Sequence, residues 1–536
     1  MKSILRLGLT FGTAGLMGGA LGCSSHVGDQ GGIDETKELV RTSTFANANG
    51  RLEVTSMTGN IDLQNPFFQN LGANGRRCDS CHKIDASMGI SVAQIQAAFN
   101  ATNGTDPIFR INDGSNAPKG FYSQIADVNQ RRISFSMLLA HGVIRVGIGI
   151  PASRDYSLVA VNDPYMFASA TELSLFRRPL PSVNVAFNSH TMWDGRESEG
   201  GRTNNLAALM NQANDATQGH AERPTPLDTA TRTAIANFQL NLFAGQVQSN
   251  IAGSLTVKGC DIQQGEENPG AACEAARGGG VALQAVFTGG NDDFPGAFTK
   301  FDGTSPASAT RLNDPLPLRA PNPAIAGVQL VPAATHDNIS FTVVEPWESA
   351  TLGANPTVNG VAQNATTTKN RGELGDGENI FYTKPIRITN VPGLNGPGDG
   401  ANAGKVIQGT CTTCHSNPDV GNHSRARFFN IGIADPNPGN VGLFNMADYP
   451  QYTFRNATGS QQVTFTDPGL ALRTGKFDDL GKFKVPQLRG LANRGPYFHN
   501  GAAKTLTDVV NYYNRRFNIG FTSEEIRKVV LFLQQT

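Results

Sequence analysis

The sequence predicts a mainly α-helical fold with long irregular loops, in which a loop-rich insertion separates two domains. The 536 residues include 60 Gly and 29 Pro but only 16% charged residues, whereas about 25% charged is typical of soluble domains. Short helical patterns with N-cap signals occur near both ends of the chain. Between them, residues 246–369 show no hydrophobic periodicity, and connections of that length usually have a structure or function of their own.

The composition also excludes several classes of protein. A formal charge of zero and the lack of basic runs argue against nucleic acid as the main partner. Gly and Pro follow no period, which excludes a collagen-like chain, and the low charge excludes long coiled coils. Seven cysteines are too few for a disulfide scaffold, so each needs its own explanation.

The first 22 residues have the features of an export signal. Lys2 and Arg6 precede an apolar stretch that runs to Cys23. The run from Gly19 to Cys23 resembles a bacterial lipoprotein signal, in which the cysteine is lipidated. The alternative is an ordinary cleaved signal with an incidental cysteine. We expect a flexible tether over 23–50 and a periplasmic or cell-envelope location, with membrane contact only through a lipid anchor in the outer membrane.

Four further cysteines form two C-x-x-C-H motifs. Two thiols three residues apart on a tight turn can form thioethers with the two vinyl groups of one haem, and the next residue, histidine, can bind its iron. We therefore expect two covalently attached haem c groups. A zinc site would need ligands from two motifs far apart in the chain, and a redox dithiol needs no trailing histidine. The motifs are Cys78-Asp79-Ser80-Cys81-His82 and Cys411-Thr412-Thr413-Cys414-His415.

The remaining cysteines, Cys260 and Cys273, lie in a Gly-rich stretch of the insertion. An exported chain folds in an oxidising compartment, where a local disulfide is the expected state of such a pair. The disulfide would constrain a loop that has little core of its own. A functional thiol is the alternative.

In the first domain, residues 51–245, three elements are expected. Ser91 precedes apolar residues at helical spacing, which predicts a capped helix. Alternating apolar residues from Ile144 to Ile150 predict a strand. A helix is predicted over Asp228–Phe243, with Asp228 as the N-cap.

In the second domain, residues 370–536, two helices are expected near the end of the chain. Thr505 precedes apolar residues that recur at helical spacing. Thr522 and Glu525 form a capping box before a second apolar pattern. The two domains share the C-x-x-C-H motif but no wider repeat.

Two further blocks of residues resemble the bacterial di-haem cytochrome c peroxidase family, which includes the MauG-type oxidases. The resemblance covers roughly residues 60–245 and 370–536, and the blocks and haem motifs occur in the family's order. The stretch from His82 to Arg177 and the insertion are extra, as in larger relatives such as the di-haem rubber oxygenases. One block, Arg177-Arg178-Pro179 with Met192-Trp193-Asp194-Gly195-Arg196, is similar to "R-N-S-P … F-W-D-G-R". The other, Phe483–Gly490 with Gly495–Gly501, is similar to "F-x-x-P-x-L-R-N … A-P-Y-F-H-x-G".

The resemblance implies two cytochrome c-like haem domains with different tasks. The N-terminal haem would react with hydrogen peroxide, and the C-terminal haem would receive electrons from a small donor protein, a cytochrome c or a cupredoxin. Trp193 would lie between the haems, although a large core residue is its plainest interpretation without the resemblance. Gln212 and Glu222 have the family's spacing for peroxide chemistry. His220 is the alternative to Glu222 as the acid/base.

The resemblance also bears on the other iron ligands and on calcium. His82 and His415 would bind the irons on one side. Tyr513 lies 14 residues after His499, where peroxidases of the family have Met and MauG-type proteins have Tyr. Tyr513 is therefore the expected sixth ligand of the C-terminal haem, with His499 as the alternative; a third possibility is that Tyr513 only belongs to the apolar face of its helix.

Two positions in the first domain concern further ligands. His141 could bind the N-terminal iron in one redox state, although a lone histidine is more often a satisfied core or turn residue. Some family members bind calcium through an asparagine at the position of Arg178, so the arginine argues against calcium here.

Three functions are consistent with these features. The first is an exported peroxidase that reduces hydrogen peroxide to water with electrons from a small redox protein, and it is the one we expect. The second is a MauG- or rubber-oxygenase-like oxidase of an organic or protein substrate. The third is a non-enzymatic electron carrier.

Overall fold

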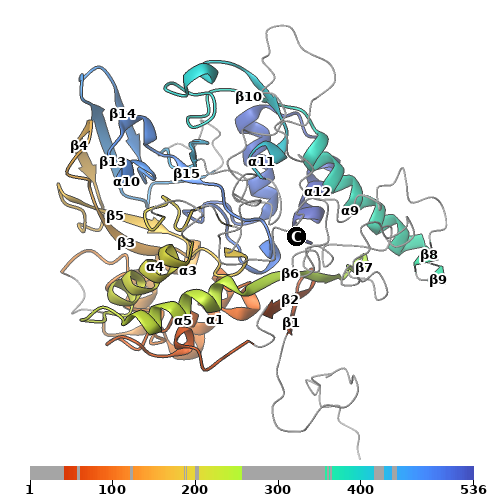
Figure 1. Ribbon diagram of the computed structural model, residues 1–536, viewed down its shortest axis with the longest axis horizontal. Helices are drawn as coiled ribbons and strands as arrows, with labels where there is room; N and C mark the ends of the chain where they lie inside the picture. The colour runs from red at the N-terminus through yellow and green to blue at the C-terminus, as the bar shows by residue number, and fades with distance from the viewer. Residues whose placement is uncertain are drawn as a thin grey trace, which may run out of the picture. The chain divides into compact units, whose positions relative to one another are not determined.

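The computed structural model describes most of the two predicted domains and little of the insertion (Figure 1). Cys23 with the export signal and the Cys260–Cys273 pair lie outside the described residues, so the predictions about them stay predictions. Within the described ranges, no helix has the length and apolar character needed to cross a membrane. Those ranges are 42–56, 61–120, 125–185, 188, 190–198, 205–255, 357–358, 361–362, 365–415, 428–436 and 444–536.

Helices begin where the N-cap signals predicted them. In α1 (Val92–Thr102), the Ser91 hydroxyl accepts a hydrogen bond from the Gln94 amide at 3.2 Å, which completes a capping box. Capping boxes also begin α11 (Leu506–Phe517) and α12 (Ser523–Leu533). The other α-helices with described bounds are α2 (Val128–Ser134), α3 (Ser136–His141), α4 (Asn205–His220), α5 (Thr229–Leu240), α9 (Ala365–Thr383) and α10 (Ala471–Thr474).

The helix predicted over Asp228–Phe243 is shorter than expected. Asp228 caps α5 as predicted, but the helix ends at Leu240 and the strand β6 (Leu242–Ser249) follows. Leu242 and Phe243 are fully buried and pair with the strand β2 (Gly50–Ser56). Pairing in the sheet therefore overrides the helical spacing of the sequence.

Small antiparallel sheets make the fold mixed, so the prediction of a mainly α fold is only partly correct. β1 (Thr42–Asn47), β2, β6 and β7 (Gly253–Ser254) form one sheet in that order. The predicted strand after His141 is confirmed as β3 (Ile144–Gly149), which pairs with β5 (Glu172–Arg177). The remaining strands are β4 (Tyr156–Asn162), β8 (Thr357–Val358), β9 (Val361–Ala362), β10 (Ile386–Ile388), β11 (Ile407–Gly409), β12 (Phe428–Phe429), β13 (Gln451–Asn456), β14 (Gln462–Phe465) and β15 (Phe483–Lys484).

The same sheet shifts two predicted boundaries. β1 lies inside the range 23–50 that was predicted to be a tether, because it pairs along its whole length with β2. β6 continues past residue 245, where the insertion was predicted to begin, because it pairs with β2 and β7. Backbone hydrogen bonding thus continues past both predicted boundaries.

The two haem-motif segments share a sheet and a core. β4 of the first segment pairs with β13 of the second, which also pairs with β14. The buried side chains around this sheet come from both segments, which places Trp193 in the shared core. They include Tyr156, Leu173, Leu175, Trp193, Tyr452, Phe454, Phe465, Leu472 and Phe483.

A buried ion cluster also joins the two segments. The guanidinium of Arg177 donates to Asp194 at 2.6 Å and to Asp467 at 2.6 and 2.8 Å. All three side chains are almost inaccessible to solvent. Burial alone would raise the pKa of Asp194, but Arg177 and Arg196 hold that pKa at about 2. Asp194 therefore stays ionised at neutral pH.

Arg177→Met should lower the free energy of unfolding by about 3–5 kcal/mol, because it leaves buried carboxylates without their shared cation. Chemical denaturation of the holoprotein measures the change. Arg527→Met is the matched control, because the Arg527 side chain is 44% exposed and its ion pairs with Glu524 and Glu373 should contribute little. Equal effects of the two substitutions would contradict the role of the cluster.

Two candidate haem sites

The two C-x-x-C-H motifs form the same local turn. Cys78–Ser80 and Cys411–Thr413 are each a single 3-10 turn. The histidine amide donates to the carbonyl of the first cysteine at 3.0 Å in the first motif and 3.1 Å in the second. In each motif, the hydroxyl of the residue before the second cysteine accepts a hydrogen bond from the backbone amide of the residue before the first cysteine. Ser80 accepts from Arg77 at 3.1 Å, and Thr413 accepts from Thr410 at 2.9 Å.

Each turn lines a cavity of its own. The N-terminal cavity is lined by the first motif, by the segment from Arg177 to Arg196 and by one face of α4, and it holds about 1370 Å³ of empty space with the solvent at its mouth included. The C-terminal cavity is lined by the second motif, by the segment from Phe483 to His499 and by α11, and it holds about 1660 Å³ on the same measure. Both cavities have the mostly apolar lining that a porphyrin requires.

The ring of His82 is already oriented for a ligand at its free nitrogen. Nδ1 lies 2.9 Å from the carbonyl oxygen of Met88 and 3.1 Å from the Ser182 hydroxyl. Because a carbonyl oxygen can only accept, Nδ1 carries the proton and Nε2 keeps a lone pair. Burial lowers the pKa of His82, which favours the neutral ring. This arrangement is the one that metal-binding histidines use.

None of the four motif cysteines forms a disulfide with a described residue. Burial raises the pKa of Cys78 to about 12, that of Cys81 to about 11 and that of Cys411 to about 12. These three thiols therefore lack the thiolate character of a catalytic dithiol. Among the described residues, no group of three or more His, Cys, Asp or Glu side chains could hold a metal ion. The zinc alternative thus gains no support in that part of the chain.

The two candidates for the sixth ligand, Tyr513 and His499, both line the C-terminal cavity. His499 is 2% exposed, stacks on Phe483 with ring centroids 4.0 Å apart, and forms no hydrogen bond through Nε2 with any described residue. Burial lowers the pKa of His499 to about 4, so the ring is neutral. Burial raises the pKa of Tyr513 well above its usual range. The choice between the two residues stays a prediction.

No methionine of the described part of the chain lines the C-terminal cavity. Met446 packs instead in a separate apolar cluster with Met137 and Phe176. His141 lies near that cluster, with Nδ1 3.2 Å from the Gly501 carbonyl oxygen, and it does not line the N-terminal cavity. Its suggested role as a ligand of the N-terminal haem therefore finds no support in the structure.

Trp193 lies in the wall that separates the two cavities. It lines both of them and is 8% exposed. Its Nε1 donates to the carbonyl oxygen of Arg178 at 2.8 Å, and its ring centroid is 6.1 Å from that of His499. The other residues that line both cavities are Arg178, Pro179, Leu180, Pro181 and Lys484. We refer to these six residues as the shared wall.

Arg178 is a buried cation of the shared wall that contacts backbone oxygens. Its guanidinium donates to the carbonyl groups of Ile90 at 2.5 Å, Gly142 at 3.1 Å and Arg494 at 2.7 Å. Burial, and then the charge of Arg494, lower the pKa of Arg178 to about 9. A fixed positive charge therefore stands at the position where the resemblance implies calcium in some relatives.

The structure brings together two of the three residues expected to act on peroxide. Gln212 and His220 lie on the face of α4 that lines the N-terminal cavity. Glu222 does not line it: the residue is exposed and has a left-handed backbone with φ of 56°. The helix ends at His220, so Glu222 lies in the turn that follows and faces solvent. The expectation for Glu222 is therefore not supported.

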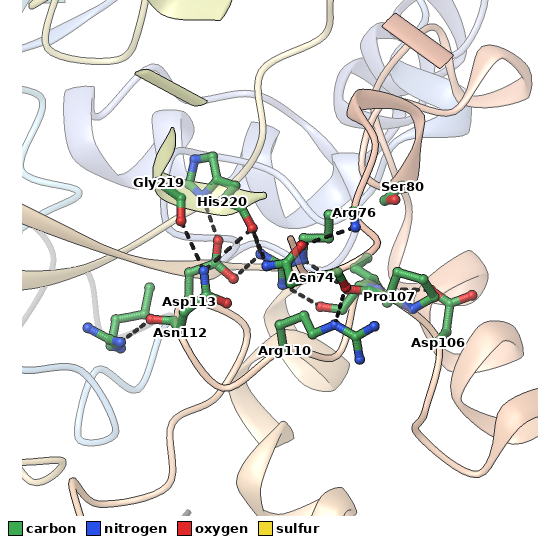
Figure 2. Close-up of polar contacts among 12 residues, drawn as sticks. Asn74, Arg76, Ser80, Asp106, Pro107, Arg110, Asn112, Asp113, Gly219 and His220 are labelled. Atoms are coloured by element: carbon green, nitrogen blue, oxygen red, sulfur yellow. Dashed lines mark hydrogen bonds and ion pairs between the residues drawn. The ribbon is translucent and has the colours of Figure 1, made fainter. Parts of the chain in front are cut away.

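Two residues that the sequence analysis missed also line the N-terminal cavity. Asp113 accepts from the guanidinium of Arg76, and its other oxygen lies 2.5 Å from Nδ1 of His220 (Figure 2). Asp113 comes from the stretch between His82 and Arg177, which is extra to ordinary members of the family that the sequence resembles. No periodicity or motif in that stretch marks it, so only the folded chain reveals the contact.

Comparison with known proteins finds similarity over part of the chain. The chain is 29% identical over 137 residues to the cytochrome-c peroxidase IdrP1 of Denitromonas iodatirespirans, which is 23% of this chain and 36% of that protein. It is 32% identical over 125 residues to the cytochrome c551 peroxidase of Nitrosomonas europaea, 23% and 29% of the two chains. It is 34% identical over 111 residues to the methylamine utilization protein MauG of Paracoccus denitrificans, 20% and 26% of the two chains.

The chain thus spans between 26% and 36% of the length of these curated relatives. No protein-family model matches it. The relatives carry the names of the family that the sequence blocks indicated, and both C-x-x-C-H turns line cavities of suitable size and polarity. These findings confirm that the chain resembles the bacterial di-haem cytochrome c peroxidase and MauG-type family.

Proposed function

We propose that this chain is an exported di-haem c-type cytochrome that reduces hydrogen peroxide to water. Electrons come from a small redox protein, a cytochrome c or a cupredoxin, and pass from the C-terminal to the N-terminal site. A lipid on Cys23 would hold the protein at the outer membrane, on its periplasmic or cell-envelope side. The overall reaction consumes one hydrogen peroxide, two electrons and two protons and yields two waters.

One observation carries the proposal: Trp193 lines both cavities, and each cavity is lined by a C-x-x-C-H turn. An electron carrier needs only exposed redox groups, whereas two sites that meet at one aromatic side chain favour transfer inside the protein. The face of α4 that carries Gln212, Thr217 and His220 lines the N-terminal cavity and not the C-terminal one. This asymmetry supports a reacting site and a relay site.

The residues present fit haem c at both sites. Cys78 and Cys81 would attach the first haem with His82 as the iron ligand, and Cys411 and Cys414 would attach the second with His415. The neutral ring of His82, with Nδ1 bound to a carbonyl, supports this fit. So does Nε2 of His499, which has no hydrogen-bond partner among the described residues. Bound haem would supply an iron that exchanges electrons and, where one side is open, binds a small ligand.

The side chains on α4 supply the proton chemistry at the N-terminal site. Cleavage of peroxide requires a proton to leave one oxygen and reach the other. Nε2 of His220 can accept and return that proton, because Nδ1 is engaged by Asp113. The amide of Gln212 lines the same cavity and can stabilise developing negative charge by donating a hydrogen bond.

A second function, oxidation of an organic or protein substrate, is favoured by the C-terminal cavity. Tyr513 and His499 line it, and none of the described methionines does. A methionine ligand would raise the potential of the relay haem. Without it, the site suits chemistry in which both haems store oxidising equivalents. The similarity to MauG points in the same direction.

The haem stoichiometry tests the assigned cysteines. The wild-type protein should carry two covalent haems per chain, measured by mass spectrometry and by the absorbance of the pyridine complex. Cys78→Ala/Cys81→Ala and Cys411→Ala/Cys414→Ala should each lose one haem, because each pair serves one site. Cys260→Ala/Cys273→Ala is the control and should keep both. Retention of both haems by either motif variant would show that the assignment is wrong.

Absorption spectra with added peroxide test the function. The half-reduced holoprotein should show a high-spin haem, and peroxide should reoxidise the protein in cycles when reduced cytochrome c is supplied. Trp193→Phe should slow reoxidation of the C-terminal haem while both haems remain attached. Trp347→Phe, at the other tryptophan of the chain, is the control. Two low-spin haems that do not respond to peroxide would contradict the peroxidase function and would favour a non-enzymatic electron carrier.

The spectrum of the C-terminal haem tests its sixth ligand. Tyr513→Phe should shift that spectrum if the phenol binds the iron, and His499→Gln should shift it if the imidazole does. Tyr512→Phe is the matched control, because Tyr512 bonds to the Ile431 carbonyl and does not line the cavity. Absence of a shift in both cavity variants would contradict both assignments.

A further inference from the structure

A buried carboxylate, Asp113, links the cation of Arg76 to the imidazole of His220 (Figure 2). One carboxylate oxygen accepts from Nη1 of Arg76, and the other lies 2.5 Å from Nδ1 of His220. Arg76 is 3% exposed and Asp113 5% exposed, whereas His220 is only partly buried. The carboxylate is therefore shielded from water, while the imidazole reaches the N-terminal cavity.

The cluster is held firmly by the backbone around it. Arg76 also donates to the carbonyl oxygens of Pro107 at 2.9 Å and Ile108 at 2.6 Å. The backbone carbonyl of His220, at the end of α4, accepts a hydrogen bond from the side-chain Nδ2 of Asn74 at 2.8 Å. It also accepts from Nη1 of Arg76 at 3.3 Å. These contacts satisfy an orphan carbonyl of the helix terminus and fix His220 relative to Asp113.

The contact decides which nitrogen of His220 is protonated. An ionised carboxylate can only accept, so Nδ1 must donate and Nε2 keeps its lone pair. Burial alone would raise the pKa of Asp113, but Arg76 and His220 lower it below its ordinary value. Asp113 is therefore ionised at neutral pH, and the tautomer with a basic Nε2 is the stable one.

We propose that Asp113 is the positioning residue of the N-terminal site, which sets the orientation and tautomer of His220, and that Arg76 keeps Asp113 in place. This positioning role rests on the proposed function of that site. It deepens that function by naming the pair, Asp113 and His220, that takes the acid/base role expected of Glu222. When Nε2 takes a proton from peroxide, the nearby carboxylate stabilises the imidazolium. His220 then returns the same proton to the other oxygen, so Asp113 remains ionised throughout.

The tautomer of His220 provides a test that is independent of turnover. Nitrogen-15 NMR of the reduced holoprotein reports it, with His220→Gln to assign the signal. The wild type should be protonated at Nδ1, and Asp113→Asn should move the proton toward Nε2. Asp106→Asn should leave the signal unchanged, because Asp106 lies in the same loop but caps the Ile108 amide at 2.9 Å. An unchanged tautomer in Asp113→Asn overturns the proposal.

Cyanide binding to the oxidised holoprotein measures the effect on proton transfer. Hydrogen cyanide gives up its proton as the anion binds, so a basic Nε2 accelerates association. Asp113→Asn should slow association by about 10–100-fold, as loss of an outer-shell partner does at other sites. In the His220→Ala background, Asp113→Asn should cause no further slowing, because Asp113 acts through His220. Equal slowing in both backgrounds overturns the proposal.

Two controls keep the test decisive. Asp113→Asn leaves the buried Arg76 charge unpaired, so the variant Arg76→Gln/Asp113→Asn, which removes both charges, should give the same change in tautomer. If the tautomer responds as expected but wild-type protein reacts with neither cyanide nor peroxide, the positioning role stands and the peroxidase function fails. If wild type reacts and Asp113→Asn behaves like it, the function stands and the positioning role fails.

Discussion

The buried contact of Arg177 with Asp194 and Asp467 is the interaction on which both candidate sites depend. Burying a guanidinium is costly unless carboxylates compensate it, and here one carboxylate comes from each segment of the chain. The contact fixes both ends of the segment that leads from Arg177 to Trp193. That segment carries most of the shared wall. The buried ion cluster therefore holds in place the residues that lie between the two cavities.

Local geometry accounts for the likeness of the two motifs. Their segments share no wider repeat, yet both motifs form a 3-10 turn. In each turn the hydroxyl of Ser80 or Thr413 accepts a hydrogen bond from the backbone amide of the residue before the first cysteine. The turn needs only residues within the motif and its neighbour, so it forms in either context. The cavity around each turn differs. The first turn lines a cavity that also receives Gln212 and His220 from α4, whereas the second lines a cavity that receives Tyr513 from α11.

Predictions of helix starts from capping residues agree with the structure. Predictions that relied only on the spacing of residues along the chain agree less often. Ser91, Thr505 and Thr522 cap helices, because capping depends on atoms within one turn. Glu222 has the family's distance from Gln212 along the chain but lies beyond the end of α4, where the left-handed backbone directs it to solvent. Phe243 has helical spacing but lies in β6, because its partner strand comes from near residue 55.

The sequence alone determined the two haem motifs, the family resemblance, the helices with clear caps, and Gln212, Glu222 and His220 as candidates. Each of these depends on residues close together in the chain or on a pattern that residue types reveal. Only the tertiary structure decided that Trp193 lines both cavities, that strands from both segments form one sheet, and that Asp113 binds His220. These contacts join residues up to hundreds of positions apart, and burial of shared charges and apolar surface, rather than any local pattern, selects them.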